Sequence, residues 1–314
     1  MPDQKVNKIR TVFAGTPSFA IPSVDAIALQ NEFELVGVYT QPDKPAGRGK
    51  KIVGSAVKRA LSTFDVPIFQ PNSLTDDATL KTFRNLRPEL FVVAAYGLII
   101  PEDFLKIPRY CINVHASLLP RWRGAAPIQR AIINLDKKTG ISVMKINNEL
   151  DSGPVCNKYE IEIKKQDNSE TISEKLSLIA SEKILDEIDN IIDGKANFIE
   201  QEHDKATYAN KIEKTEGKIN WNIKAEEILG LINGLFPSPG AWFTFKGERY
   251  KILKAEVGNS TGEPGIVLNE NLEVGCKERS LKIIEIQREG KKVQKIGEFM
   301  LGSQIRKGSI ISNV

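Results

Sequence analysis

The first 192 residues alternate apolar segments with segments of helical spacing, and this alternation constrains the fold more than any other feature. Segments dominated by apolar side chains lie at residues 9–14, 35–40, 90–95 and 111–115. Helical patterns lie at residues 18–29, 55–64, 80–86, 126–135 and 169–192. Strands that are apolar on both faces are typical of parallel sheets covered by helices on both sides. We therefore predict an α/β domain with a doubly wound, mostly parallel sheet, in which Ser18 caps the first helix.

The rest of the chain, from about residue 208, has a different pattern. One helical segment at 225–235 is followed by short alternating segments at 242–253, 265–268, 272–276, 281–287 and 293–299. The segment at 242–253 is predicted to form a hairpin, and the whole series is typical of a small OB-like β-barrel. The sequence therefore predicts an α/β domain at residues 1–192, a linker at 193–207 and a β domain at 208–314.

Composition excludes several classes of protein. The longest apolar run, Leu90 to Ile100, has 11 residues, whereas a membrane-spanning helix needs about 20. The basic N-terminus is not followed by an apolar stretch of signal-peptide length. The three cysteines are far apart and the two histidines are too few for a multi-histidine zinc site, which argues against a disulfide framework and a metal site. We expect a cytoplasmic protein with no metal and no membrane contact.

Local charge is more informative than the net charge of +4. Residues 44–64 contain six basic side chains and residues 104–135 contain five, in both cases without an acidic one. A third, mixed basic stretch covers residues 277–295. Basic patches attract phosphate backbones, and a solvated basic face is the alternative interpretation. Three such stretches in one chain favour a nucleic-acid partner without deciding the matter.

Three polar side chains follow predicted strands at positions where they are expected to meet. Asn113 and His115 are two residues apart at the end of a strand, so their side chains share one face. Ligands bind at the carboxyl edge of such sheets. The basic loop at 117–124, with its proline and glycine, is a candidate for ligand contact. Asp151, after the apolar segment at 141–146, supplies a carboxylate at another strand end.

An amide, an imidazole and a carboxylate suit acyl transfer to an amine. The first two stabilise a developing oxyanion, and the third orients the imidazole or helps to remove a proton. Asn-x-His pairs also occur as capping or core pairs, and Asp-x-Gly also occurs as a turn. Cys111 is expected to pack as a small hydrophobe, and Gly15-Thr16-Pro17 lacks the dinucleotide glycine pattern. The residues by themselves indicate an α/β enzyme with a small β domain, with RNA binding left open.

The sequence also resembles the methionyl-tRNA formyltransferases along almost its whole length. The resemblance rests on motifs in both predicted domains: VFAGTP at 12–17, TQPDKPAGRGKK at 40–51, AAYGLIIP at 94–101, INVHASLLPRWRGAAPIQ at 112–129, LDSG at 150–153, TYANKI at 207–212, INW at 219–221 and FPSPGAW at 236–242. The long central motif is typical of 10-formyltetrahydrofolate-dependent formyltransferases, and the basic loop and the C-terminal half select the tRNA enzyme among them.

This resemblance implies roles for particular residues. Asn113, His115 and Asp151 match the catalytic trio. The segments that bind or border the folate are matched by Ser117, Leu118, Leu119, Pro120, Tyr96 and Gly97. The loop at 41–51, which carries Arg48, Lys50 and Lys51, matches one that enters the acceptor end of initiator tRNA, with Arg48 placed to probe the first base pair. The resemblance implies a Rossmann-like formyltransferase domain, an OB-type tRNA-binding domain, 10-formyltetrahydrofolate as co-substrate and no metal. Nothing in the sequence demands more than a monomer.

The implied activity is formyl transfer to the α-amino group of methionyl initiator tRNA in translation initiation. The alternatives are a formyltransferase or formyl hydrolase for a small molecule, and an RNA-binding protein with a vestigial catalytic domain. Two positions depart from the family pattern. Ala116 replaces a common glycine, which would cost on the order of 1 kcal/mol if the backbone there had a positive φ. Asn220 stands where relatives often have Asp before the tryptophan.

Overall fold

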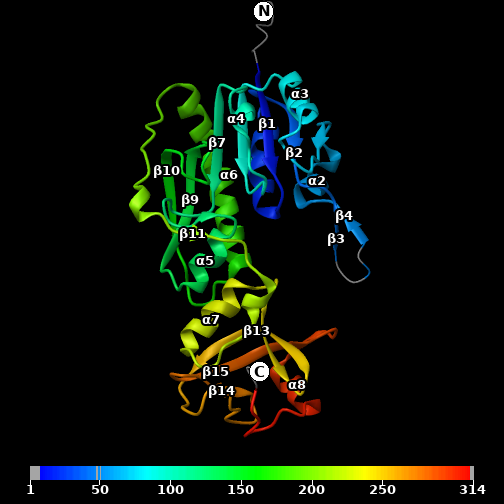
Figure 1. The fold of residues 1–314 in the computed structure, drawn as a ribbon, viewed down its shortest axis with the longest axis vertical. Helices are drawn as coiled ribbons and strands as arrows, with labels where there is room; N and C mark the ends of the chain where they lie inside the picture. Colours follow the sequence, from blue (N-terminus) through cyan, green and yellow to red (C-terminus); the bar gives the residue numbers. More distant parts are fainter. Residues whose placement is uncertain (1–7, 47–48, 50, 312–314) are drawn as a thin grey trace, which may run out of the picture. The chain divides into compact units, whose positions relative to one another are not determined.

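The chain forms two compact units, which we describe separately (Figure 1). The computed structural model describes residues 8–46, 49 and 51–311, so Arg48 and Lys50 lie outside the described residues. Unit 1 contains the chain up to Pro127, Thr139–Ile161 and Ser173–Ala209. Unit 2 contains Ile128–Lys138, Glu162–Ile172 and Asn210–Val314. No described helix is long and apolar enough to span a bilayer.

A seven-stranded sheet is the centre of unit 1. Its order is β10-β9-β7-β6-β1-β2-β5, and the strands are β1 (Ile9–Gly15), β2 (Phe33–Tyr39), β5 (Ile68–Phe69), β6 (Leu90–Ala94), β7 (Tyr110–His115), β9 (Lys138–Lys145) and β10 (Val155–Glu162). The pairs from β7 through β6, β1 and β2 to β5 are parallel, and β9 is antiparallel to β7. The predicted doubly wound, mostly parallel sheet is confirmed.

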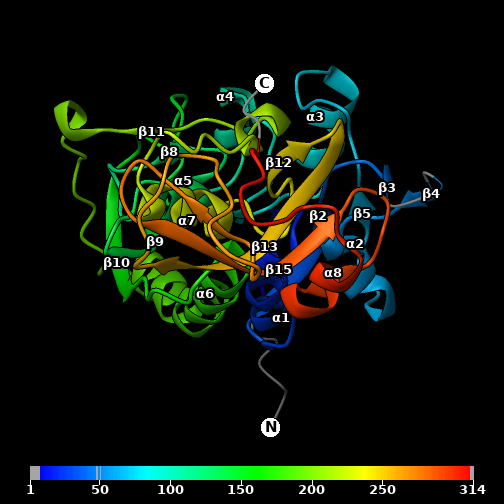
Figure 2. The same ribbon diagram turned by 90° about the horizontal axis from the view of Figure 1, so that it is seen from below.

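Helices cover both faces of this sheet. Figure 2 shows α1 (Ile21–Ala28) and α6 (Ser169–Ile192) along one face, and α3 (Asp77–Asn85) and α4 (Glu102–Leu105) along the other. Phe83 of α3 and Phe104 of α4 pack with Phe91 of β6 in a buried cluster. The predicted cap at Ser18 is wrong. Ser18 starts a short 3-10 turn, and α1 begins after Ala20 with a proline in its first turn, where the missing N–H costs nothing.

A two-stranded arm extends from unit 1 (Figure 1). It consists of β3 (Lys44–Ala46) and β4 (Lys51–Val53), paired antiparallel. Lys58 on α2 (Ala56–Ala60) holds its base, because the Nζ donates to the two carboxylate oxygens of Asp43 over 3.0 and 2.8 Å. Lys51 is exposed on this arm.

Unit 2 is built on a curled antiparallel sheet, in agreement with the predicted OB-like domain. Its order is β12-β13-β15-β14, with β16 paired to β15. The elements are α5 (Pro127–Ile133), α7 (Ala225–Gly234), β12 (Ala241–Phe245), β13 (Glu248–Gly258), β14 (Glu273–Gly275), β15 (Ser280–Arg288), β16 (Val293–Lys295) and α8 (Ile296–Gly302). Register shifts in β13 after Ile252 bend the sheet, as bulges do. Trp221, Phe243 and Tyr250 belong to the core it encloses.

One predicted strand of unit 2 is wrong, and another is confirmed only in its first half. Residues 265–268 form only isolated bridges to neighbouring segments. The predicted strand at 293–299 stops at Lys295, and α8 begins at Ile296. Ile296, Phe299 and Met300 all pack against the core. Their spacing of three and four residues puts them on one helical face, whereas a strand would have placed the first two on opposite faces.

Candidate active site

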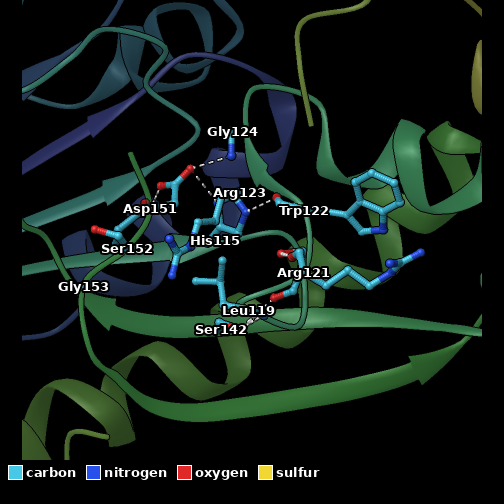
Figure 3. A network of polar contacts seen from close by, with 12 residues as sticks. His115, Leu119, Arg121, Trp122, Arg123, Gly124, Ser142, Asp151, Ser152 and Gly153 are labelled. Atoms are coloured by element: carbon cyan, nitrogen blue, oxygen red, sulfur yellow. Dashed lines mark hydrogen bonds and ion pairs between the residues drawn. The ribbon is translucent and has the colours of Figure 1, made fainter. Parts of the chain in front are cut away.

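The structure brings together the three residues predicted to be catalytic. Asn113 and His115 lie on β7, and Asp151 lies in the loop that follows β9. The Asn113 Nδ2 donates to the Asp151 Oδ1 over 3.2 Å. The His115 Nδ1 lies 3.5 Å from the Asp151 Oδ2 (Figure 3). The side chains of His115 and Asp151 are only 6% and 16% exposed, so the carboxylate and the imidazole interact with little screening by water.

Both nitrogens of the His115 ring face oxygen atoms. The Nε2 lies 2.8 Å from the Trp122 carbonyl oxygen, and the Nδ1 faces the Asp151 carboxylate (Figure 3). A carbonyl oxygen only accepts hydrogen bonds, so the Nε2 must carry a proton. A proton on the Nδ1 as well makes the contact with the carboxylate attractive. The arrangement therefore fixes the orientation of the ring between the Trp122 carbonyl and the Asp151 carboxylate.

Left-handed backbone conformations shape this site. Trp122 has a φ of 63°, Gly124 of 117° and Asp151 of 47°. Each non-glycine residue in this region stores about 1–3 kcal/mol, which the surrounding contacts must offset. One such contact is the Gly124 N–H, which donates to the Asp151 Oδ2 over 2.8 Å. A Cβ at Gly124 would lie 2.9 Å from the Ala209 carbonyl oxygen, so both its φ and its surroundings favour glycine.

The segment predicted to bind folate is held in place by two serine hydroxyls, those of Ser117 itself and of Ser142 on β9. Ser117 donates through its hydroxyl to the Arg121 carbonyl over 2.6 Å. The Ser142 hydroxyl donates to the Ser117 carbonyl over 2.7 Å and accepts from the Leu119 N–H over 3.1 Å. Leu119 is buried and Leu118 is half-buried. The peptide bond between Leu119 and Pro120 is cis. This segment presents a fixed shape directly after β7.

Tyr96 and Gly97 follow β6, the strand next to β7, but the Tyr96 ring itself packs in the core of unit 1. Burial raises the pKa of its hydroxyl. Gly97 is exposed, and the carbonyls of both residues accept hydrogen bonds. The Gly97 carbonyl accepts from the Gln41 Nε2 over 3.0 Å, and the Tyr96 carbonyl accepts from the Thr16 hydroxyl over 2.8 Å. Gln41 thereby links the base of the β3–β4 arm to the segment predicted to border the folate.

The two departures from the family pattern carry no visible penalty. Ala116 is not among the residues with positive φ, so the expected cost of replacing glycine does not arise. The Asn220 side-chain oxygen accepts from the Asn222 N–H over 3.0 Å. An aspartate would make the same contact through its carboxylate.

At least three of the five basic side chains in the stretch at 104–135 have partners within the protein. Arg123 is 3% exposed, within β8 (Arg123–Gly124). The Lys106 Nζ lies 2.7 Å from a Glu102 carboxylate oxygen, and the Arg130 Nη1 lies 2.6 Å from Glu216. Those three positive charges are therefore directed to partners within the protein. Within the loop at 117–124, a candidate for ligand contact, the buried Arg123 guanidinium binds a side chain of the chain itself.

Sequence reasoning missed three groups at this site. Two are backbone groups, the Trp122 carbonyl and the Gly124 N–H, and backbone groups have no residue signature. The third is the side chain of Gln201, whose Nε2 donates to the Asp151 carbonyl over 2.9 Å from 50 positions away. Of these three, only Gly124 was indicated by the sequence, because a glycine can mark a position with a positive φ. In the described part of the chain, no three His, Cys, Asp or Glu side chains are arranged to hold a metal ion.

The sheet and its site define an α/β enzyme equipped to transfer an acyl group to an amine. The sequence profile of the Formyl transferase family matches residues 7–188, and that of the Formyl transferase, C-terminal domain, matches residues 211–304. The chain belongs to this family, and its relatives place it among the methionyl-tRNA formyltransferases.

Two of these relatives match almost end to end. The methionyl-tRNA formyltransferase of Pelagibacter ubique (strain HTCC1062) is 53% identical over 97% of this chain and 99% of its own length. That of Thermodesulfovibrio yellowstonii (strain ATCC 51303 / DSM 11347 / YP87) is 43% identical over 95% of this chain and 97% of its own. Because both relatives are covered nearly completely, the likeness extends over both units.

Solved structures share the fold at lower identity. The sugar 3N-formyl transferase WlaRD, solved in the presence of dTDP and 5-N-formyl-THF, is 20% identical, with a TM-score of 0.68 over 90% of this chain and 99% of its own. HypX from Aquifex aeolicus, in complex with tetrahydrofolic acid, is 15% identical, with a TM-score of 0.65 over 98% of this chain and 51% of its own. At these identities the likeness shows the fold alone.

Proposed function

We propose that this chain transfers the formyl group of 10-formyltetrahydrofolate to the α-amino group of methionyl initiator tRNA. The observation that carries the proposal is the meeting of Asn113, His115 and Asp151 in a chain that is 53% identical to a methionyl-tRNA formyltransferase over 97% of its length. Because its acceptor is an aminoacylated tRNA, the enzyme acts in the cytoplasm.

In the proposed reaction, the amine nitrogen attacks the formyl carbon and a C–N bond forms. The electron pair of the carbonyl moves to its oxygen. One N–H of the Asn113 amide donates to Asp151, and the second donates to this oxyanion, whose charge the nearby His115 imidazolium also stabilises. Asp151 keeps the ring charged and assists loss of the amine proton. The bond from the formyl carbon to the folate nitrogen then breaks, and that nitrogen takes up a proton.

The substrates are proposed to meet at the carboxyl edge of β6 and β7. The segment from Ser117 to Pro120, together with the backbone of Tyr96 and Gly97, binds the folate. The loop at 41–51 enters the acceptor end of the tRNA through Arg48, Lys50 and Lys51. A weak terminal base pair costs less to open, which is a physical basis for choosing the initiator. Residues 1–192 form the catalytic domain, 193–207 the linker and 208–314 the tRNA-binding domain.

A formyl-transfer assay tests this proposal. Purified protein is incubated with 10-formyltetrahydrofolate and methionyl initiator tRNA, methionyl elongator tRNA or no acceptor. We expect formylation of the initiator only. Release of formate without an acceptor would instead favour a hydrolase, and tRNA binding without transfer would favour a vestigial catalytic domain.

The tRNA loop has a separate test. Arg48→Ala is expected to weaken use of the tRNA, seen as a higher KM for methionyl initiator tRNA, while the KM for the folate stays the same. An unchanged dependence on tRNA concentration would remove this loop from the proposal without affecting the catalytic trio.

A further inference from the structure

We propose that Gln201 is a positioning residue for the reaction. In this proposal, Gln201 holds the Asp151 loop in its left-handed conformation and so aims the Asp151 carboxylate at His115. The inference rests on the role proposed above for Asp151. Gln201 lies between the two segments that match the family profiles, 7–188 and 211–304, in the part of the chain that the sequence predicts to be a linker.

All hydrogen-bonding positions of the Gln201 amide are used. Its Nε2 donates to the Asp151 carbonyl over 2.9 Å and to the Gly153 carbonyl over 2.7 Å. Its Oε1 accepts from the Arg123 Nε over 3.0 Å and from the Arg123 Nη2 over 2.8 Å. The residue is 7% exposed. An amide offers two donors and two acceptor sites, so the side chain is fully satisfied in one orientation only.

Arg123 fixes that orientation. A guanidinium only donates hydrogen bonds, so it must face the oxygen of the Gln201 amide and leave the NH2 group directed at the loop. Arg123 is 3% exposed. Its Nη1 and Nη2 also lie 3.4 Å from the Nδ1 of His203, which therefore acts as the acceptor. A buried cation with two neutral partners is costly in itself, but here it locks the direction of the amide.

The Asp151 loop requires such support. Asp151 has a φ of 47°, and this conformation directs its carbonyl to Gln201 while its carboxylate contacts Gly124 and His115. At Gly153, a Cβ would lie 2.1 Å from the Lys145 carbonyl oxygen. The loop thus lies tightly against β9 on one side and is bonded to Gln201 on the other. Without the amide donors, two carbonyls would lose their partners and the strained conformation would lose its support.

The segment around Gln201 contacts both loops of the site, the one that contains Trp122 and the one that contains Asp151. Ile199 and Val155 exchange two backbone hydrogen bonds of 2.9 Å, just after the Asp151 loop. Thr207 accepts from the Trp122 N–H over 2.9 Å through its hydroxyl and from the Arg123 N–H over 2.8 Å through its carbonyl. The residues at 199–209 therefore hold the loop that supplies the Trp122 carbonyl as well as the loop that supplies Asp151.

Gln201→Glu is the most direct test. The carboxylate still accepts from Arg123, with added charge attraction, but it lacks the two donors to the loop. Gln201→Met removes all four hydrogen bonds at similar volume. Asn157→Ala is the matched control, since it removes one amide hydrogen bond to the buried Glu187 in the same unit without touching the site.

For Gln201→Glu we expect kcat to fall on the order of 10-fold, because misplacement by about 1 Å costs up to about 100-fold. The KM values for folate and tRNA should stay within about twofold, and Asn157→Ala should leave kcat unchanged. A merely structural role would lower the melting temperature without this kcat effect. A folded Gln201→Glu protein with unchanged kcat would overturn the proposal. If Gln201→Met does not fold, Gln201→Glu decides alone.

A double-mutant cycle with Asp151→Ala shows whether Gln201 acts through Asp151. We expect Gln201→Glu to lower kcat little further in a protein that already lacks Asp151. An equal fall in both backgrounds would overturn the inference and leave the proposed function intact. An Asp151→Ala protein with normal kcat would instead overturn the proposed role of Asp151, and this inference with it.

Discussion

The polar site of unit 1 and the core of unit 2 depend on different forces. In unit 1, the site depends on directional hydrogen bonds among buried polar groups, with Asp151 and Trp122 in left-handed conformations. In unit 2, the curled sheet encloses an apolar and aromatic core, in which Phe243 stacks on Tyr250 with ring centroids 5.5 Å apart. Hydrogen bonds determine orientation, whereas apolar burial determines stability with little directional demand.

This difference separates two kinds of consequence. A change in the polar network of unit 1 alters where a few atoms point, so it should appear mainly in kcat. A change in the core of unit 2 alters buried area, so it should appear mainly in the free energy of unfolding. The predictions below test that separation, from the largest expected effect to the smallest.

His115→Ala should have the largest effect. It removes the ring that lies between the Trp122 carbonyl and Asp151, and with it the proposed stabilisation of the oxyanion. We expect kcat to fall on the order of 1000-fold, with little change in the affinity for methionyl initiator tRNA. Steady-state kinetics and a tRNA-binding titration measure the two quantities. Lost tRNA binding with normal chemistry would contradict the role of His115 and the contrast between the units.

Phe243→Ala should have the largest effect in unit 2. Phe243 is 1% exposed and contacts the rings of Trp221 and Tyr250. Replacing a buried phenylalanine by alanine costs about 3–5 kcal/mol, which urea unfolding measures. Leu301→Ala is the control, because Leu301 is 87% exposed and its truncation should cost almost nothing. Normal stability of Phe243→Ala would show that unit 2 does not depend on its core.

Sequence reasoning predicted most of the fold because the fold depends on patterns of burial. Apolar strands and helical spacing gave the parallel sheet, and α6 has the bounds expected for it, Ser169–Ile192. The failures lie in short segments. The segment at 293–299 is predicted to be a strand, but Ile296 and Phe299 are three residues apart, and both pack against the core of unit 2 from one face of α8.

The site was predictable only in part, for a related reason. Asn113 and His115 lie on one strand, and their spacing of two residues reveals a shared face. Asp151 is marked by its place after a strand. Gln201 has no such marker, because it comes from a segment without regular structure and reaches the loop only in three dimensions. The burial of Arg123 was not predictable either, because it depends on Gln201, a partner 78 positions away in the sequence.

Arg130→Met should have a smaller effect that depends on pH. The hydrogen bond from Arg130 holds the pKa of Glu216 below its ordinary value of 4.5, and the two side chains are 19% and 33% exposed. A lowered carboxyl pKa stabilises the protein above pH 4.5, and this contribution is lost as the pH falls through the folded-state pKa. We expect a loss of about 1 kcal/mol at pH 7.

At pH 3 the difference between Arg130→Met and the unchanged protein should be smaller. It should not vanish, because Arg130 also donates to the neutral Asn210 carbonyl over 3.0 Å. Lys224→Met is the control, since Lys224 and Glu278 form an exposed pair whose loss should be negligible. Thermal unfolding at both pH values measures the effect. A destabilisation that grows toward acid pH would show that the ion pair is not its source.

The smallest effect is expected from alkylating reagents, because the cysteines of both units are protected in the same way. Burial raises the pKa of Cys111 and Cys156 in unit 1 and of Cys276 in unit 2 to about 12, with Glu187 adding to the effect at Cys156. From an ordinary value of 9.0, this lowers the thiolate fraction at pH 8 about a thousandfold, and alkylation needs the thiolate. Iodoacetamide should therefore leave all three thiols unmodified and the activity unchanged. Mass spectrometry and the formyl-transfer assay measure these two outcomes. In urea, which unfolds the protein, all three thiols should react. Rapid alkylation of Cys111 in the folded protein, with loss of activity, would show that the strand carrying Asn113 opens to solvent and that the polar site is less fixed than its hydrogen bonds indicate.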